Sequence, residues 1–361
     1  MENRVTIQDI ADSLGLSRNT VSKAINNTGV LADSTRQKIL ARAIEMGYKQ
    51  FSYLDLDAVQ NSLTPPAPAK NEIALITTWF LNGSHFSAMM LDKFQMEISK
   101  RGYSMSMHFA RAEDIAAQRL PASLRLENCA AIICIEVFDA SYARFICQSG
   151  VPVLFVDAPA DPGADPLPAD ILIMNNDDGI SQFIHLMKKR GICDIGFAGE
   201  AMHCRSFFER FMAYRNSMYL CSLPIHEEWC LTEKPDPVPT SSGMSPAEYY
   251  FYSRLKEFRK LPRVFICAND FVAIDLMHAL NRLDLRVPED VMILGFDDSA
   301  ESLLVTPKLS TIHIHSQIMG FSATDLILSR IQNPALNYRT CSCETNLILR
   351  ESTEGRQEAH A

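Results

Sequence analysis

The chain has 361 residues, of which 47% are hydrophobic and 21% are charged, and its formal net charge is −9. This composition excludes a disordered protein, and no apolar run reaches the roughly 18–20 residues that span a bilayer. The length allows two or three domains. Because no secretory leader opens the sequence and the ten cysteines are scattered, we expect a cytoplasmic protein with reduced thiols and no membrane contact.

The charge is unevenly divided along the chain. Residues 1–50 contain seven basic and five acidic side chains, whereas the remainder contains 27 basic and 38 acidic ones. A small basic segment on an acidic body suits local contact with nucleic acid. We therefore expect a DNA-binding domain in the first fifty residues.

Three short helices are predicted in this domain. Thr6 precedes an amphipathic segment, and Asp9 lies three residues after Thr6. This spacing indicates a capping box at the start of the first helix. Gly15 is a typical helix stop, and Ser17 is a natural N-cap for the second helix. With a third helix over residues 33–47, the pattern is typical of a helix-turn-helix domain.

The second helix, in "LSRNTVSKAINN", carries polar residues at spacings of three and four, so they share one side. Arginine pairs well with guanine and asparagine with adenine, while lysine and serine suit bases or phosphates. The alternative is an ordinary solvated face. We predict that this side enters the major groove of double-stranded DNA, with two helix starts near phosphates. The predicted DNA-binding residues are Thr6, Ser17, Arg18, Asn19, Ser22 and Lys23.

A proline-rich linker follows, and from Glu72 apolar strands alternate with amphipathic helices. This alternation predicts parallel sheets with helices on both faces, and the length suits two doubly wound sheets side by side. Strands are expected at 73–80, 104–109, 130–137, 151–158, 170–174, 194–199, 263–269, 291–297 and 310–315. Helices are expected between them at 89–101, 181–190, 207–220, 272–283 and 317–331.

Parallel α/β sheets bind ligands at the carboxyl ends of their strands. This rule points to residues that directly follow the predicted strands, and each could instead be a core residue or a helix cap. The strand-end candidates are Thr78, Trp79, Phe80, Glu136 and Asp157 in the first half, and Asn269, Asp270 and Asp297 in the second. Of these, Asp270 is expected to cap the helix that follows it.

The segments "VTIQDIADSLGLSRNTVSKAIN", "STRQKILARAIEMGY", "RVFICANDFVAIDLMHAL" and "RVPEDVMILGFDDS" resemble the lactose-repressor/galactose-repressor family of bacterial transcription regulators. The resemblance implies a helix-turn-helix domain joined to a core like the type I periplasmic sugar-binding proteins. It also implies three chain crossings between two similar α/β subdomains, a small effector held between them, and a homodimer on a pseudo-palindromic operator. Arg18, Asn19 and Lys23 would contact bases.

By the same resemblance, Arg210, Asn269 and Asp297 would contact the effector, and Arg205 lies near the same loop. Together with an aromatic ring such as Trp79, these groups suit a polyhydroxylated sugar. The expected effector-binding set is Trp79, Phe80, Glu136, Arg205, Arg210, Asn269 and Asp297. The expected domains are residues 1–50, a linker at 51–71 and a core at 72–361, with one subdomain at about 72–174 and 313–333 and the other at about 175–312 and 334–352.

The segment "YKQFSYLDLDAVQ" departs from the family pattern. The family commonly has a Pro-Asn start to a short hinge helix that enters the minor groove. Here that start is absent, and Asp55 and Asp57 would repel a phosphate backbone. Leu54 or Leu56 remains available for a shifted version of the same contact.

No enzyme or cofactor motif is found. The sequence contains neither G-x-x-x-x-G-K-[ST] nor G-x-G-x-x-G, and neither His313 with His315 nor Cys341 with Cys343 has a further metal ligand nearby in sequence. We expect no cofactor, no metal and no catalysis, but a repressor of a carbohydrate operon whose operator affinity is set by a sugar. The alternatives are a sensor of a purine or another metabolite, a DNA-tethered α/β enzyme and a solute-binding protein.

Overall fold

The computed structural model describes residues 5–25, 31–46, 70–78, 85–238 and 242–354. The chain divides into two compact units, residues 1–69 and 70–361. Most of the expected linker, together with Trp79 and Phe80, lies outside the described residues. No described helix combines the length and the apolar character that crossing a bilayer requires.

Within its described residues, 5–25 and 31–46, the first unit contains three helices, α1 (Ile7–Leu14), α2 (Arg18–Ile25) and α3 (Asp33–Glu45). The capping box at Thr6 and Asp9 is present, and Gly15 ends α1 with a left-handed φ of 66°. A glycine adopts this backbone conformation without the steric cost that a Cβ brings. Apolar residues from all three helices form one buried core that includes Ile10, Val21 and Ile39.

The second unit contains a six-stranded sheet in the order β11-β5-β4-β3-β1-β2, in which every pair is parallel. Near-continuous apolar strands account for its burial on both faces. Its strands are β1 (Glu72–Thr77), β2 (Ser104–Phe109), β3 (Cys129–Ile135), β4 (Val153–Val156), β5 (Asp170–Met174) and β11 (Thr340–Cys343). The helices connected to it are α5 (His85–Ser99), α6 (Ala112–Ala116), α7 (Ala140–Cys147) and α13 (Ser316–Gln332). This sheet with its helices is the first subdomain.

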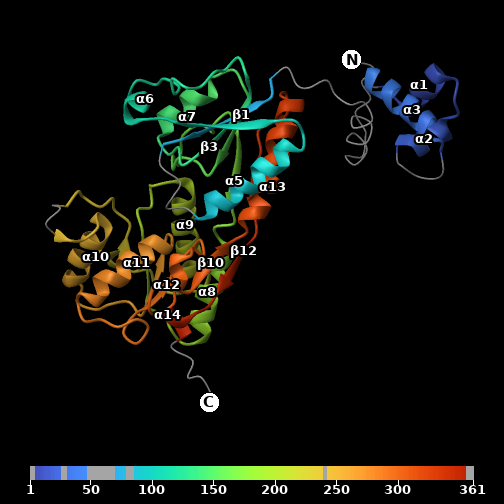
Figure 1. Ribbon diagram of the computed structural model, residues 1–361. Coiled ribbons are helices and arrows are strands. Elements are labelled where there is room, and N and C mark those ends of the chain that lie inside the picture. Colours follow the sequence, from blue (N-terminus) through green and yellow to red (C-terminus); the bar gives the residue numbers. More distant parts are fainter. Residues whose placement is uncertain (1–4, 26–30, 47–69, 79–84, 239–241, 355–361) are drawn as a thin grey trace. The chain divides into compact units, whose positions relative to one another are not determined.

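The second subdomain is built on a four-stranded parallel sheet in the order β7-β6-β8-β9. Figure 1 shows the two subdomains as separate lobes. Its strands are β6 (Ile195–Ala198), β7 (Cys230–Leu231), β8 (Val264–Cys267) and β9 (Met292–Leu294), and its helices are α8 (Asp178–Lys189), α9 (Arg205–Leu220), the 3₁₀ helix η2 (Glu227–Trp229), α10 (Pro246–Glu257), α11 (Asp270–Asn281), α12 (Glu301–Leu304) and α14 (Glu351–Glu354).

A two-stranded antiparallel sheet of β10 (Thr311–Ile314) and β12 (Thr345–Ile348) accompanies the second subdomain. The chain therefore passes between the subdomains three times, after β5, between β10 and α13, and between β11 and β12. In the sequence analysis, residues 334–352 are assigned to the second subdomain. For β11 this assignment is wrong, because β11 belongs to the six-stranded sheet of the first subdomain. β11 pairs with β5 because Arg330 and Arg339 both bond to the buried carboxylate of Asp170, the first residue of β5.

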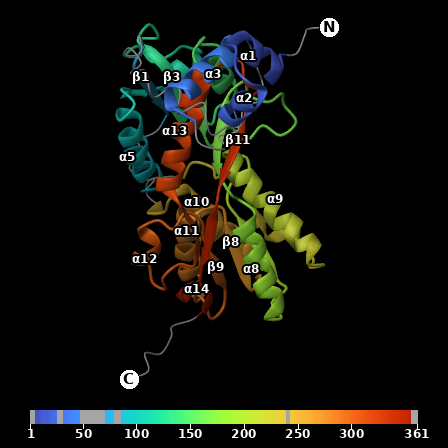
Figure 2. The ribbon, with the colours of Figure 1, turned by 90° about the vertical axis from the view of Figure 1, so that its right-hand side faces the viewer.

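Helices α5 and α13 pack against each other along one flank of the first subdomain, as both ribbon views show (Figure 2). Gly320 on α13 makes this close contact possible, because a Cβ there would stand 2.5 Å from the carbonyl oxygen of Met90. Close backbone approach is one of the structural uses of glycine. The pairing fixes the helical layer on that face of the six-stranded sheet.

Candidate functional site

The polar side of α2 is exposed. Arg18, Asn19 and Lys23 face solvent, whereas Val21 and Ile25 on the opposite side are buried in the core of the first unit. Ser22 is half-buried between the two sides. The amphipathic pattern in the sequence thus corresponds to a helix that presents a row of hydrogen-bond donors.

The hydroxyls of Thr6 and Ser17 cap the starts of α1 and α2. Thr6 Oγ1 accepts a hydrogen bond from the Asp9 amide at 3.3 Å, and Ser17 Oγ accepts one from the Thr20 amide at 3.1 Å. Hydrogen bonds from Thr6 lower the pKa of Asp9. These caps give both helix N-termini a fixed direction, and such termini favour anions.

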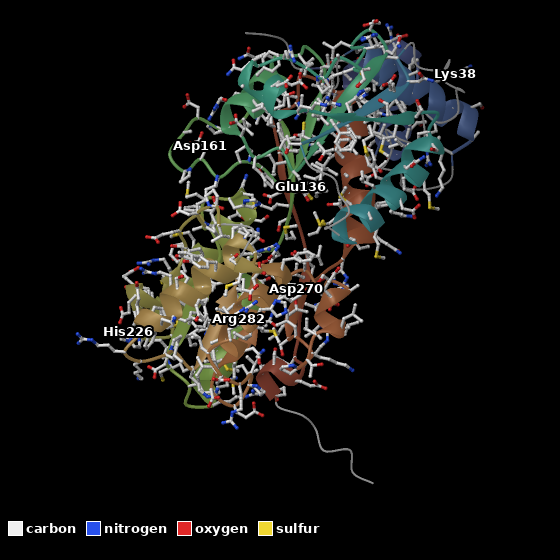
Figure 3. The ribbon with its side chains drawn as sticks, turned by 60° about the vertical axis from the view of Figure 1, so that its left-hand side comes forward. Lys38, Glu136, Asp161, His226, Asp270 and Arg282 are labelled. Atoms are coloured by element: carbon white, nitrogen blue, oxygen red, sulfur yellow. The ribbon has the colours of Figure 1, made fainter. Side chains whose placement is uncertain are left out.

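A cavity of about 300 Å³ in the second unit is lined by residues at the carboxyl ends of strands from both sheets. Glu136 follows β3 and Asp157 follows β4, while Asn269 follows β8 and Asp297 comes shortly after β9. In Figure 3, Glu136 is labelled in the first subdomain near the junction, and Asp270, next to Asn269, in the second. The cavity therefore lies between the subdomains.

Arg210 is the buried centre of the cavity wall, with only 2% of its surface exposed. Its Nε donates to Asn176 Oδ1 at 2.9 Å and its Nη1 donates to the Ala268 carbonyl at 2.6 Å. The guanidinium lies 3.5 Å from the ring centre of Phe296 and within 3.4 Å of Asp297. Hydrogen bonds, a cation–π contact and an ion pair together hold one orientation of this side chain.

Four cavity carboxylates stand on backbone that is unfavourable for side chains with a Cβ. Glu136, Asp157, Asp297 and Asp298 have φ values of 57°, 61°, 111° and 55°. Such strain gathers at functional sites, where the surrounding structure holds it in place. Burial also raises the pKa values of the first three, that of Asp297 to about 6 even though Arg210 lies beside it.

Aromatic rings form another part of the wall. His203 contacts Phe138 edge-on at 5.2 Å between ring centres and Phe207 at 5.0 Å, and all three line the cavity. Burial lowers the pKa of His203, so the neutral imidazole is favoured. Phe138 comes from the first subdomain and Phe207 from α9 of the second. A row of aromatic rings in mutual contact thus reaches from one subdomain to the other.

Of the expected effector residues, the structure brings Glu136, Arg210, Asn269 and Asp297 to this cavity. Arg205 is not among its lining residues: its Nε donates to Glu209 at 2.7 Å, and its side chain borders a different cavity, beside the loop after β4. The structure does not bring Arg205 to this cavity, because Arg205 begins α9, more than one helical turn before Arg210 and on another side of the helix. Trp79 and Phe80 lie outside the described residues.

The expected cap of α11 is also corrected. Asn269, not Asp270, caps this helix, since its Oδ1 accepts from the Val272 amide at 2.9 Å. Asp270 is instead fully buried, with Thr311 Oγ1 donating to it at 2.6 Å and the Ser299 amide at 2.7 Å. Burial raises the pKa of Asp270 to about 7.

Sequence reasoning left His203 and Phe207 out of the site. Both follow the strand β6, so the strand-end rule could have found them, but the segment between β6 and α9 gives no motif of its own. Asp157, a strand-end candidate outside the expected effector-binding set, lines the cavity as well.

Among the described residues, Glu248, Asp275 and His278 have potential ligand atoms within 4.8 Å of one another. Two of these groups are already engaged by the protein. Glu248 is paired with Arg282, and Asp275 accepts the hydroxyl of Ser245 at 2.9 Å. These contacts account for the cluster as part of the packing between α10 and α11.

Comparisons with known proteins agree with this architecture. Residues 6–50 match the family of bacterial regulatory proteins of the lacI type, and residues 184–353 match a periplasmic binding protein-like domain. The HTH-type transcriptional regulator GalR of Lacticaseibacillus casei is 28% identical over 350 residues, covering 96% of this chain and 99% of that protein.

Solved structures share the fold. A transcriptional regulator CelR–cellobiose complex superposes with a TM-score of 0.66 at 19% identity, covering 97% of this chain and all of that one. The lac repressor dimer bound to operator and the anti-inducer ONPF superposes with a TM-score of 0.64 at 21% identity, covering 97% and 99%.

A helix-turn-helix unit joined to a two-subdomain core with a cavity at its strand ends defines a DNA-binding transcriptional regulator with a small-molecule-binding core. The chain carries the helix-turn-helix domain of the lacI family of bacterial regulatory proteins together with a periplasmic binding protein-like domain. The relative named above is likewise a transcriptional regulator.

Proposed function

We propose that this protein represses transcription by placing α2 in the major groove of an operator, and that a polyhydroxylated sugar in the cavity controls its affinity for DNA. The observation that carries this proposal is the cavity wall itself. Carboxylates, the amide of Asn269 and the guanidinium of Arg210 converge there beside the rings of Phe138 and Phe207. Alternating acceptors and donors suit sugar hydroxyls, and the rings suit the apolar face of a pyranose.

On the DNA side, Arg18 and Asn19 are proposed to contact bases and Lys23 to contact a base or a phosphate. The exposure of these three side chains at the start and middle of α2 supports this assignment. Lys23 stands where the family usually has arginine, so its contact is less directional. The hydroxyls of Thr6 and Ser17, with Ser22, would lie near phosphates, where capped helix N-termini favour anions.

A sugar is favoured over a purine by the number of hydrogen-bonding groups that face the cavity. The solved structure of the transcriptional regulator CelR is a complex with cellobiose, which adds support from a similar fold. A purine is the alternative, because a planar base could stack on Phe138 or Phe207. The two ligand classes differ in their need for Asp297 and Arg210, which suit paired hydroxyls.

Effector binding would act through contacts that join the subdomains. The amide of Ser206 at the start of α9 donates to Asp157 Oδ1 at 3.1 Å, and the Arg205 amide donates to the Ala158 carbonyl at 2.8 Å. A ligand that bonds to Asp157 therefore competes with a junction between the two lobes. A coupling of about 1–3 kcal/mol would change DNA affinity roughly 5–150-fold.

A homodimer in the cytoplasm is proposed as the DNA-binding form. An exposed apolar surface on the first subdomain supports it: Met89 and Met96 lie seven residues apart on α5, and Met107 and Phe109 lie on the edge strand β2. The β2 residues are in register with Leu75 and Thr77 of β1, on the sheet face that α5 covers. Large exposed apolar patches mark interaction surfaces.

The effector proposal is tested by a thermal-shift screen of the protein against sugars, sugar phosphates, polyols and nucleobases. A ligand at 100 times its Kd adds about 2.7 kcal/mol to the stability of the domain that binds it. A sugar that stabilises the core and loses its effect in Asp297→Asn supports the proposal. A response to purines alone would replace the sugar by the alternative ligand class.

A further inference from the structure

Acidic side chains outnumber basic ones around the cavity. Four carboxylates line it in the described part of the chain, against a single guanidinium, that of Arg210. Residues 79–84, which follow β1 and lie outside the described residues, have the sequence WFLNGS and contain no lysine or arginine. This segment therefore contributes no basic side chain that could offset the acidic ones. The four carboxylates are those of Glu136, Asp157, Asp297 and Asp298.

Two of the four carboxylates have basic partners within the second unit. Asp298 Oδ1 accepts from Arg350 at 2.5 Å, and its Oδ2 lies 2.9 Å from His313 Nδ1. Asp297 is paired with Arg210 at 3.4 Å. The charges of these two groups are largely compensated by the protein itself.

Glu136 and Asp157 form no ion pair within the described part of the chain. Asp157 accepts hydrogen bonds from the amides of Ala158 and Ser206 and from the thiol of Cys204, and the nearby charge of Arg210 also acts to lower its pKa. The carboxylate of Glu136 makes no hydrogen bond or ion pair with the described side chains, although its backbone carbonyl accepts from Thr78. Burial, followed by repulsion from Asp157 and Asp297, raises the pKa of Glu136. Within the described residues, the protein supplies no counter-charge for the carboxylate of Glu136.

The protein's own groups already contact the aromatic part of the wall. Phe138 and Phe207 both contact His203, and the guanidinium of Arg210 lies 5.9 Å from the ring centre of Phe207. Burial lowers the pKa of His203, so the neutral imidazole is favoured and adds little positive charge. A ligand cation here would meet the carboxylate of Glu136, whereas a phosphate or carboxylate would meet repulsion from it.

We propose that the effector carries a protonated amino group beside its hydroxyls, as an amino sugar does, and that Glu136 accepts this group together with Asp157. The inference rests on the proposed function, in which a sugar occupies the cavity. It narrows the ligand class to cationic sugars and excludes sugar phosphates and sugar acids. Asp297, Asn269 and Arg210 then serve the hydroxyls.

The test compares matched ligands by calorimetric titration of the full-length protein. Glucosamine, galactosamine and mannosamine are each measured beside the parent hexose, with glucose 6-phosphate and glucuronate as anionic probes. One amino sugar is expected to bind at least about tenfold more tightly than its parent, which is the scale of one hydrogen bond to a charged group. The two anions are expected to give no heat of binding.

The variant Glu136→Gln keeps the shape of the side chain and removes its charge. It is expected to abolish the difference in affinity between the amino sugar and its parent hexose. Glu113→Gln is the matched control, since Glu113 is exposed on α6 and does not line the cavity. The control should keep the full preference for the amine.

Two results would overturn the inference in distinguishable ways. If a neutral hexose binds as tightly as its amino counterpart, or Glu136→Gln keeps the preference, the cationic class is wrong and the sugar-binding function stands. If no sugar of any charge binds while a nucleobase does, both the inference and the sugar proposal are wrong. Tighter binding of an anionic probe than of any amine would also reject the cationic class.

Discussion

The guanidinium of Arg210 and the carboxylate of Asp297 lie 3.4 Å apart in the wall of the cavity, and they come from two different elements. Arg210 comes from α9 and is almost fully buried, whereas Asp297 follows β9 on backbone with a φ of 111°. Neither position is explained by local preference. The pair thus ties a helix of the second subdomain to the strand end where an effector would bind.

Replacing Arg210 with Met should abolish the effector response and lower the stability of the core. Asp297 would keep its burial and lose its cationic partner, and removal of one partner of a buried pair costs about 3–5 kcal/mol. Urea unfolding measures the loss. The double variant Arg210→Met/Asp297→Asn should recover part of it, because no unpaired carboxylate is left. Equal stability of the single and double variants would show that the pair is not coupled.

The stability of the core should decrease as the pH rises from about 5 to 7.5, in part because of Asp270. Its pKa is about 7 in the folded protein, against an ordinary aspartate value of 3.8, so the folded state binds the extra proton between these values. The stabilisation is complete below the unfolded pKa and is lost as the pH rises through 7. Thermal melts of Asp270→Asn should show a flatter pH dependence in this window. An unchanged slope would mean that Asp270 is ionised throughout.

Replacing Arg18 with Ala should relax base preference at one position in each operator half-site. A bidentate arginine–guanine contact discriminates against other bases by about 1–3 kcal/mol. Selection of binding sites from a random DNA library, followed by affinity measurements at fixed salt, gives the preference. Arg42→Ala on α3 is the control for the loss of one charge. Equal weakening on every sequence would place Arg18 on a phosphate instead.

Replacing Met96 or Met107 with Glu should convert the proposed dimer into monomers. Both side chains are about half exposed, and a carboxylate buried in a dimer interface would lose its hydration. Sedimentation velocity gives the oligomeric state. Met212→Glu, on the exposed side of α9, should leave it unchanged. A dimer that survives both changes on α5 and β2 would place the interface elsewhere.

The sequence predicted the parts of the fold that depend on local pattern. Apolar strands, amphipathic helices and the Thr6 capping box depend on residues close together in sequence. The structure contains these elements, and their ends differ from the predicted ends by a few residues. Strand β11 could not be predicted in the same way. Its sequence TCSC has no apolar run, and its place depends on Asp170 and Arg330, of which Asp170 lies far from it in sequence.

In the candidate site too, the sequence predicted the features that depend on local pattern and not those that depend on distant residues. The strand-end rule found Glu136, Asn269 and Asp297, because their positions follow from β3, β8 and β9. The choice between Asn269 and Asp270 as a cap could not be made from sequence, since both residue types cap helices. Thr311, 41 residues further on, decides it by bonding to Asp270.

The central claim is that a ligand in the cavity controls DNA binding by α2, and one titration tests it directly. Fluorescence anisotropy would follow binding to an operator selected from a random library, with and without the sugar identified by the thermal-shift screen. The expected result is a change in operator affinity of about fivefold or more that disappears in Asp297→Asn, while the variant binds DNA normally without ligand. A ligand that stabilises the core but leaves operator affinity unchanged would contradict this claim.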